Sequence, residues 1–115
     1  MDTKGLQKKL AKFCGERDWD QFHNPKNLAM ALSVECSELV EEFQWLSLEQ
    51  SSDIMKDPDK AIRVRHEIAD IAAYLLRITD NLDIDIEAAL VEKIQINEEK
   101  YPAKEFKGSA RKYNR

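Results

Sequence analysis

Apolar residues recur at helical spacing along four stretches of the chain, and each stretch begins near a residue that can cap a helix. Two of these caps precede a proline, which suits the first helical position. The pattern predicts helices from Thr3, as N-cap, to about Asp18, from Asn24-Pro25 to about Trp45, from Asp57-Pro58 to about Asp80-Asn81, and from Asp83 or Asp85 to about Tyr101. A capping-box spacing at Ser47 to Gln50 predicts a short helix within the 46–57 connection. We therefore expect an all-α fold.

The end of the chain lacks this periodicity. Pro102 ends the last predicted helix, and the residues that follow are basic and contain Gly108-Ser109. We expect one helical domain over residues 1–102 and a basic C-terminal tail over residues 103–115, either mobile or reaching a neighbouring subunit. The tail's charged side chains are expected to be solvated: Lys104, Lys107, Arg111, Lys112 and Arg115.

The amino-acid composition argues against several classes of protein function. The 115 residues include only 3 Gly and 3 Pro, which argues against a turn-rich β fold and excludes a glycine-rich phosphate loop. A net charge of −4 disfavours nucleic acid as a partner, and any phosphate chemistry would need a metal cation. Cys14 and Cys36 form no CxxC pair, and neither a leader nor an apolar run of membrane length is seen. We expect a cytoplasmic protein without membrane contact.

Acidic residues occupy positions where a helical core should be. On the helix expected over residues 25–45, Glu35, Glu38 and Glu42 fall inside the apolar arc, whereas Glu41 lies outside it. That arc is formed by Leu28, Ala31, Leu32, Cys36, Leu39, Phe43 and Leu46. Burying a carboxylate is costly without a cation, hydrogen bonds or water. These positions therefore require a specific explanation.

The next two helices extend this anomaly. Glu67 and Asp70 lie on the edge of the apolar side of the third helix, whereas Lys93, Asn97 and Lys100 face inward on the fourth. Five inward acids exceed two inward lysines, so a structural salt-bridge network would leave negative charge unmatched. A hard cation with oxygen ligands, Mg²⁺ or Mn²⁺, accounts for the surplus better. Di-iron and zinc sites are disfavoured because the carboxylates lack suitably spaced His or Cys partners.

An ordered set of motifs makes the pattern specific. Glu35-x-x-Glu38 followed by Glu67-x-x-Asp70 resembles the signature of the all-α nucleoside triphosphate pyrophosphohydrolases, the MazG-like superfamily. The flanking sequence resembles its small dCTP pyrophosphatase branch over roughly residues 3–102. The segments that carry the likeness are Glu16 to Leu28, Phe43-Gln44-Trp45, Glu67 to Ile71, Lys93 to Asn97, and Tyr101-Pro102.

The resemblance implies a four-helix-bundle-type fold and Mg²⁺-dependent hydrolysis of a nucleoside triphosphate to the monophosphate and pyrophosphate, with Mn²⁺ as a possible substitute. It implies metal binding and catalysis by Glu35, Glu38, Glu67 and Asp70. The triphosphate would meet Lys93, Asn97, Lys100 and Tyr101, and the base would lie near Trp19, Trp45 and Tyr74, with His23 nearby. It further implies house-cleaning of surplus or non-standard nucleotides, dCTP-like substrates, and a dimer or dimer-of-dimers tetramer.

Simpler interpretations remain open for several residues. Trp19, Trp45 and Tyr74 could serve packing alone, and His23 could only bridge a turn. Cys36 is expected to be a small core residue. Three arginines of the third helix are expected to be exposed-face charges: Arg63, Arg65 and Arg77. At the level of the whole protein, the alternative is a non-enzymatic helical interaction module whose inward charges fix the register of the bundle.

Overall fold

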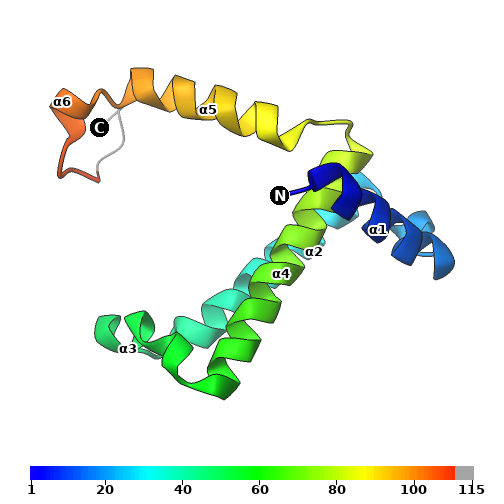
Figure 1. The fold of residues 1–115 in the computed structure, drawn as a ribbon, viewed down its shortest axis with the longest axis horizontal. Coiled ribbons are helices and arrows are strands. Elements are labelled where there is room, and N and C mark those ends of the chain that lie inside the picture. Colours follow the sequence, from blue (N-terminus) through cyan, green and yellow to red (C-terminus); the bar gives the residue numbers. More distant parts are fainter. Residues whose placement is uncertain (111–115) are drawn as a thin grey trace. The chain divides into compact units, whose positions relative to one another are not determined.

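The computed structural model describes residues 1–110, which contain helices and no strand (Figure 1). The all-α expectation is therefore confirmed. The elements are α1 (Thr3–Glu16), η1 (Asp20–Phe22), α2 (Pro25–Phe43), α3 (Leu48–Ser52), η2 (Ile54–Lys56), α4 (Pro58–Asn81), α5 (Ile86–Lys100) and α6 (Ala103–Phe106). Contacts divide the chain into two units, Met1–Asp83 and a second that begins at Ile84, and each unit is described by itself.

Side-chain caps fix where the helices begin. Asn24 accepts a hydrogen bond from the Asn27 amide at 2.9 Å, and Asp57 and Asp85 cap α4 and α5 in the same way. The Ser47 capping box is complete in both directions. The first cap differs from the expectation, because Asp2 rather than Thr3 accepts from the backbone at the start of α1. A carboxylate there also complements the positive end of the helix dipole.

The first two helices end earlier in the sequence than their periodicity alone predicts. The first helix ends at Glu16 because the chain turns through Asp18, which has a φ of 55°, in the left-handed region that aspartate tolerates. The second helix ends at Phe43, so Trp45 lies beyond its C-terminus. The connection that follows contains α3 and η2 before Pro58 opens α4.

The first unit is organised around α4. Helix α2 lies side by side with α4 in the opposite direction, and α1 packs against the later part of α4 (Figure 1). Gln7 of α1 donates to the Leu76 carbonyl and to the Thr79 hydroxyl, both at 3.3 Å. Among the described residues, the buried apolar side chains are Cys14, Leu28, Ile54, Val64 and Leu76. This core is small for a chain of 115 residues.

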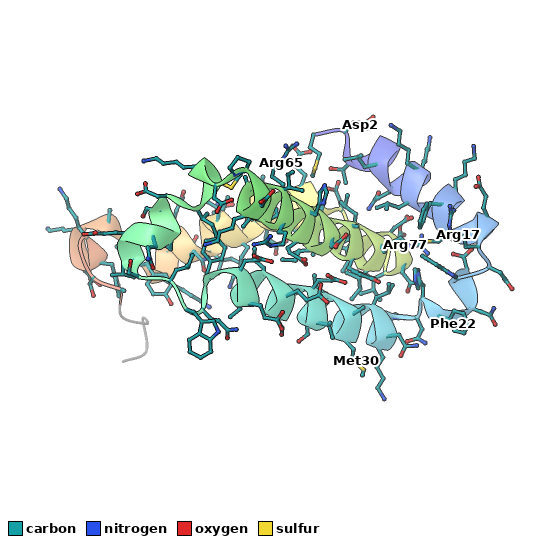
Figure 2. All side chains as sticks on the ribbon, turned by 90° about the horizontal axis from the view of Figure 1, so that it is seen from below. Asp2, Arg17, Phe22, Met30, Arg65 and Arg77 are labelled. Atoms are coloured by element: carbon teal, nitrogen blue, oxygen red, sulfur yellow. The ribbon has the colours of Figure 1, made fainter. Side chains whose placement is uncertain are left out.

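Many large apolar side chains remain on the surface of this single chain. Met30 points away from α4 on the outer side of α2 and is 58% exposed (Figure 2). On α4, Ile62 and Ile68, which the periodicity places on a bundle-facing side, are half exposed. Cys36 is also exposed, so its expected core role is wrong for this chain. It lies one residue, and therefore about 100° around the helix, from the inward Glu35.

The C-terminal region contains one element that the sequence pattern did not predict. Residues Ala103–Phe106 form the single turn α6, and Phe106 packs edge-on against Tyr101 with ring centroids 5.0 Å apart. The expected tail residues Arg111, Lys112 and Arg115 lie outside the described residues. Within residues 1–110, every helix is too short or too polar to cross a membrane.

Candidate functional site

Three carboxylates meet where α2 lies against α4. Glu35 and Glu38 are one turn apart on the same face of α2, and Glu67 reaches them from α4. One carboxylate oxygen from each residue lies within 4.8 Å of the others, and all three side chains are partly buried. The antiparallel pairing of two helices, each with its acids on the inner face, therefore builds one acidic cluster.

Two oxygens of this cluster lack any partner among residues 1–110. Glu35 Oε2 and Glu67 Oε2 are both buried and accept no hydrogen bond there. Buried polar atoms are nearly always satisfied in native proteins, so two such atoms in one cluster require a reason. A cation bound between the helices would provide one.

The cluster is also electrostatically uncompensated. Burial raises the pKa of Glu35 to about 7, assisted by a hydrogen bond to Glu38 and by the surrounding negative charges. The pKa of Glu67 is raised by burial and then by Glu38. The nearby Arg63 forms an ion pair with Glu42, in which Arg63 Nε lies 3.2 Å from Glu42 Oε2. Within the first unit, residues 1–83, no lysine or arginine forms an ion pair with the three cluster residues.

Asp70 and Tyr74 flank the cluster on α4. Asp70 is exposed and is not one of the three residues whose oxygens meet, but its negative charge contributes to the raised pKa of both Glu35 and Glu67. Burial raises the pKa of Tyr74, and the charges of Glu35 and Asp70 raise it further. Asp70 thus adds negative charge beside the three acids without being one of the residues whose oxygens meet, and Tyr74 senses the same charges.

The two tryptophans have different surroundings. Trp45 is 87% exposed, so it packs little against the described residues. Trp19 is 42% exposed and contacts Phe13 edge-on, with ring centroids 5.5 Å apart. His23 lies beside Trp19, at a centroid distance of 6.4 Å. Trp19 is therefore partly committed to packing, whereas Trp45 is not.

Arg77 is the residue that the sequence pattern misjudged most. Its side chain is only 11% exposed, so Arg77 is not the exposed-face charge that was expected, and it bonds to both Asp20 and His23. Those partners lie 57 and 54 residues earlier in the chain, so local periodicity could not reveal them. A usable signal was present, because Arg77 continues the stripe of Glu67, Asp70 and Tyr74 along α4.

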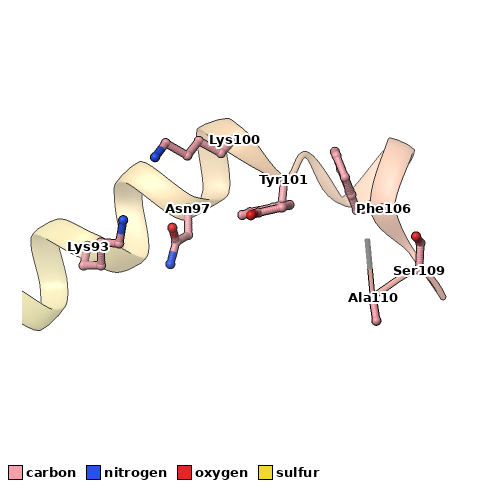
Figure 3. Close-up of a pocket in the computed structure, with 7 residues that line it drawn as sticks. All are labelled: Lys93, Asn97, Lys100, Tyr101, Phe106, Ser109 and Ala110. Carbon is pink, nitrogen blue, oxygen red and sulfur yellow. The ribbon is translucent and has the colours of Figure 1, made fainter. Parts of the chain in front are cut away.

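The residues expected at the triphosphate meet in the second unit. Helical spacing brings Lys93, Asn97, Lys100 and Tyr101 to one face of α5 and its end, where they line a pocket of about 460 Å³. The sequence pattern missed the other lining residues because they follow Pro102 without periodicity: Phe106, Ser109 and Ala110 (Figure 3). Two ammonium groups, an amide and two hydroxyl groups suit this pocket to an anion.

Comparison with known proteins defines the class of this chain. The MazG-like family model matches residues 30–115, and the chain belongs to the MazG-like family. It is similar to dCTP pyrophosphatase 1 of Rattus norvegicus and of Homo sapiens, each 37% identical over 103 residues that cover 90% of this chain and 61% of the relative. The chain thus spans about three-fifths of the length of these relatives.

A solved structure agrees with this assignment. A pyrophosphatase from Archaeoglobus fulgidus is 36% identical to the chain, with a TM-score of 0.82. The match covers 89% of this chain and 94% of the archaeal one. The resemblance inferred from the ordered motifs is therefore confirmed.

Proposed function

We propose that this protein is a Mg²⁺-dependent nucleoside triphosphate pyrophosphohydrolase that converts (d)NTP to (d)NMP and pyrophosphate, with dCTP-like substrates favoured. The observation that carries the proposal is the cluster of three carboxylates, in which two buried oxygens have no hydrogen-bond partner among residues 1–110. The names of the similar proteins, dCTP pyrophosphatase and pyrophosphatase, supply the reaction class. Removal of surplus or non-standard nucleotides in the cytoplasm is the corresponding role.

The donor set fits a hard divalent cation. Glu35, Glu38 and Glu67, with Asp70 beside them, offer oxygen ligands, which Mg²⁺ prefers and Mn²⁺ accepts. When bound, such an ion neutralises phosphate charge and activates a water molecule. Zinc is a poorer match because the only described histidine and cysteine ligands lie outside the cluster.

The chain's own groups have separate tasks in this proposal. Lys93 and Lys100 neutralise the triphosphate and stabilise the leaving pyrophosphate, while Asn97 and Tyr101 orient it by hydrogen bonds. Phosphoryl transfer requires little covalent chemistry from the protein, so positioning and charge can supply most of the acceleration. Trp45 follows the end of α2 that is opposite to His23, so its exposed face would stack on the base of a nucleotide bound by a neighbouring subunit.

We also propose that the active form is a homo-oligomer, a dimer or a dimer of dimers. Val34 and Val40 on α2 and Ile62 and Ile68 on α4 are each more than half exposed in the single chain. Apolar area of this extent on paired helices is typical of surfaces that a second subunit covers.

The reaction is tested by product identification with dCTP. We expect dCMP and pyrophosphate to form in Mg²⁺ and to stop forming when excess chelator is added. Release of orthophosphate would contradict the proposed bond cleavage, and unchanged turnover in chelator would contradict the metal. A screen of natural and modified nucleotides under the same conditions identifies the preferred base and sugar.

A further inference from the structure

The far end of the α2–α4 pair holds a second polar cluster that the proposed chemistry leaves unused. Arg77 donates from Nε to His23 Nδ1 at 3.4 Å, and its Nη2 lies 3.3 Å from the same nitrogen. Nη2 also contacts Asp20 Oδ1 at 3.0 Å. Asn81 donates to the His23 backbone carbonyl at 3.0 Å. Both the ring and the backbone of His23 are therefore held by α4.

These contacts fix the proton on the imidazole. An arginine side chain is a permanent donor without acceptor capacity, so His23 Nδ1 must accept and cannot carry a proton. The neutral ring then has its single proton on Nε2. Burial and the Arg77 charge both lower the pKa of His23, which agrees with a neutral ring. Nε2 has no hydrogen-bond partner among the described residues and is not sealed from solvent, so this N–H is available to a ligand.

The position of this donor suits the base of a nucleotide. At about 100° per residue, Glu67, Asp70, Tyr74 and Arg77 lie within about 80° of one another on α4. Arg77 is seven residues beyond Asp70, which is about 10 Å along the helix axis. This separation is comparable to that between the triphosphate and the base of an extended nucleotide. The ring of Trp19 beside His23 adds an aromatic surface at the same end.

We propose that Arg77 is a positioning residue that presents His23 Nε2–H to an acceptor on the base, such as the ring nitrogen or carbonyl oxygen of a pyrimidine. The inference rests on the proposed function, because it assumes that a nucleotide binds with its phosphates at the carboxylates. Asp20 helps to hold Arg77 in place by accepting a hydrogen bond from Nη2 of its guanidinium group. Arg77 itself does not touch the base.

The first test examines the imidazole directly, without turnover. Nitrogen-15 NMR of the ring in metal-free protein should show a neutral His23 with the proton on Nε2 at pH 7.5. In Arg77→Met, the Nδ1 resonance should shift because its donors are lost. Arg65→Met is the matched control, since Arg65 lies about 120° away from Arg77 around α4. A proton on Nδ1 in the wild type, or an unmoved resonance in Arg77→Met, overturns the inference.

The second test separates binding from chemistry. Loss of one oriented hydrogen bond should raise KM for dCTP about three- to tenfold in Arg77→Met, with kcat within about twofold. Arg77→Lys retains a cation near Asp20 but cannot bond through two nitrogens, so its KM should be intermediate. Arg65→Met should resemble the wild type. An Arg77→Met variant that melts at a lower temperature with unchanged KM has lost only structure, and that result overturns the proposal.

A double substitution tests whether Arg77 acts through His23. Glutamine places an amide N–H near the position of Nε2 and needs no tautomer, so His23→Gln should retain partial binding. In that background, Arg77→Met should raise KM by less than about twofold. An equal increase in both backgrounds overturns the proposed route. Wild-type turnover with normal KM in Arg77→Met defeats this inference alone, whereas a wild type that cleaves no nucleotide defeats the proposed function as well.

Discussion

Two polar clusters on the same pair of helices differ in how their hydrogen-bonding capacity is met. In the middle of the α2–α4 pair, carboxylates converge with two buried oxygens that have no described partner. At the end of the pair, Arg77 is largely buried and its Nε and Nη2 engage His23 and Asp20. Unmet acceptors indicate that a ligand is required, whereas a bonded donor indicates that a neighbouring side chain is being held in place.

The largest expected effect is on the unmet cluster. Glu38→Gln removes one of the carboxylates proposed to hold the cation that stabilises the transition-state charge, and it should lower kcat about 10²- to 10³-fold, the usual cost of losing such stabilisation. Glu41→Gln is the matched control, because Glu41 is an exposed acid on the same helix. Circular dichroism should show both variants folded. Comparable activity in the two variants would remove the functional distinction between the clusters.

Metal binding should stabilise the fold through the same cluster. At a Mg²⁺ concentration of about 100 times Kd, linkage predicts about 2.7 kcal/mol of added stability. Thermal melts of the wild type and of Arg77→Met should both rise in Mg²⁺, whereas Glu38→Gln should respond weakly. An equal rise in all three would mean that the ion binds elsewhere.

The two tryptophans allow the same comparison among aromatic side chains. Trp45 is mostly exposed, so Trp45→Ala should weaken dCTP binding by about 1–3 kcal/mol, seen in KM, with little change in Tm. Trp19→Ala should lower Tm, because it removes an edge-on contact with Phe13 worth about 0.5–1.5 kcal/mol. If Trp45→Ala instead lowers Tm with KM unchanged, its role is packing, against a partner subunit.

The smallest expected effect is a pH dependence of stability without metal. The folded-state pKa of Glu35, about 7, exceeds the ordinary glutamate value of 4.5, so its contribution favours folding below pH 4.5 and is lost as the pH rises through 7. His23 acts in the opposite direction, because its lowered pKa costs stability as the pH falls through 6.5. Melts in chelator from pH 5 to 8 should therefore show a shallower alkaline decline for Glu35→Gln than for the wild type. Identical slopes would show that Glu35 carries no buried charge.

The starts of the helices and the direction of many side chains could be predicted from the sequence, because both depend on residues within one or two helical turns. Helix caps at Asn24, Asp57 and Asp85 depend on residues within one turn, and so does the inward direction of Glu35 and Glu38. The ordered motifs then allowed the chain to be compared with the MazG-like family. Predictions that depend on one helix and its own period are therefore the ones that succeeded.

The rest depends on contacts between distant segments. Arg77 was assigned to the surface because its partners come from a connector more than fifty residues away. Cys36 was assigned to the core because its arc is apolar, although α4 covers only part of that arc in this chain. Helical periodicity predicts the direction in which a side chain points, but it does not predict which residues of another segment the side chain will contact.

The connection between α2 and α4 has a consequence for how such a chain can change in length. Its short helix begins in a capping box of Ser47 and Gln50, which is closed within the segment itself. The carboxylates lie farther along the paired helices, where their spacing depends on helical rise and packing rather than on the turn. Insertions or deletions among the exposed residues of this connection can therefore accumulate without altering the distance between the acids, whereas Ile54, which is buried, must keep its place in the core.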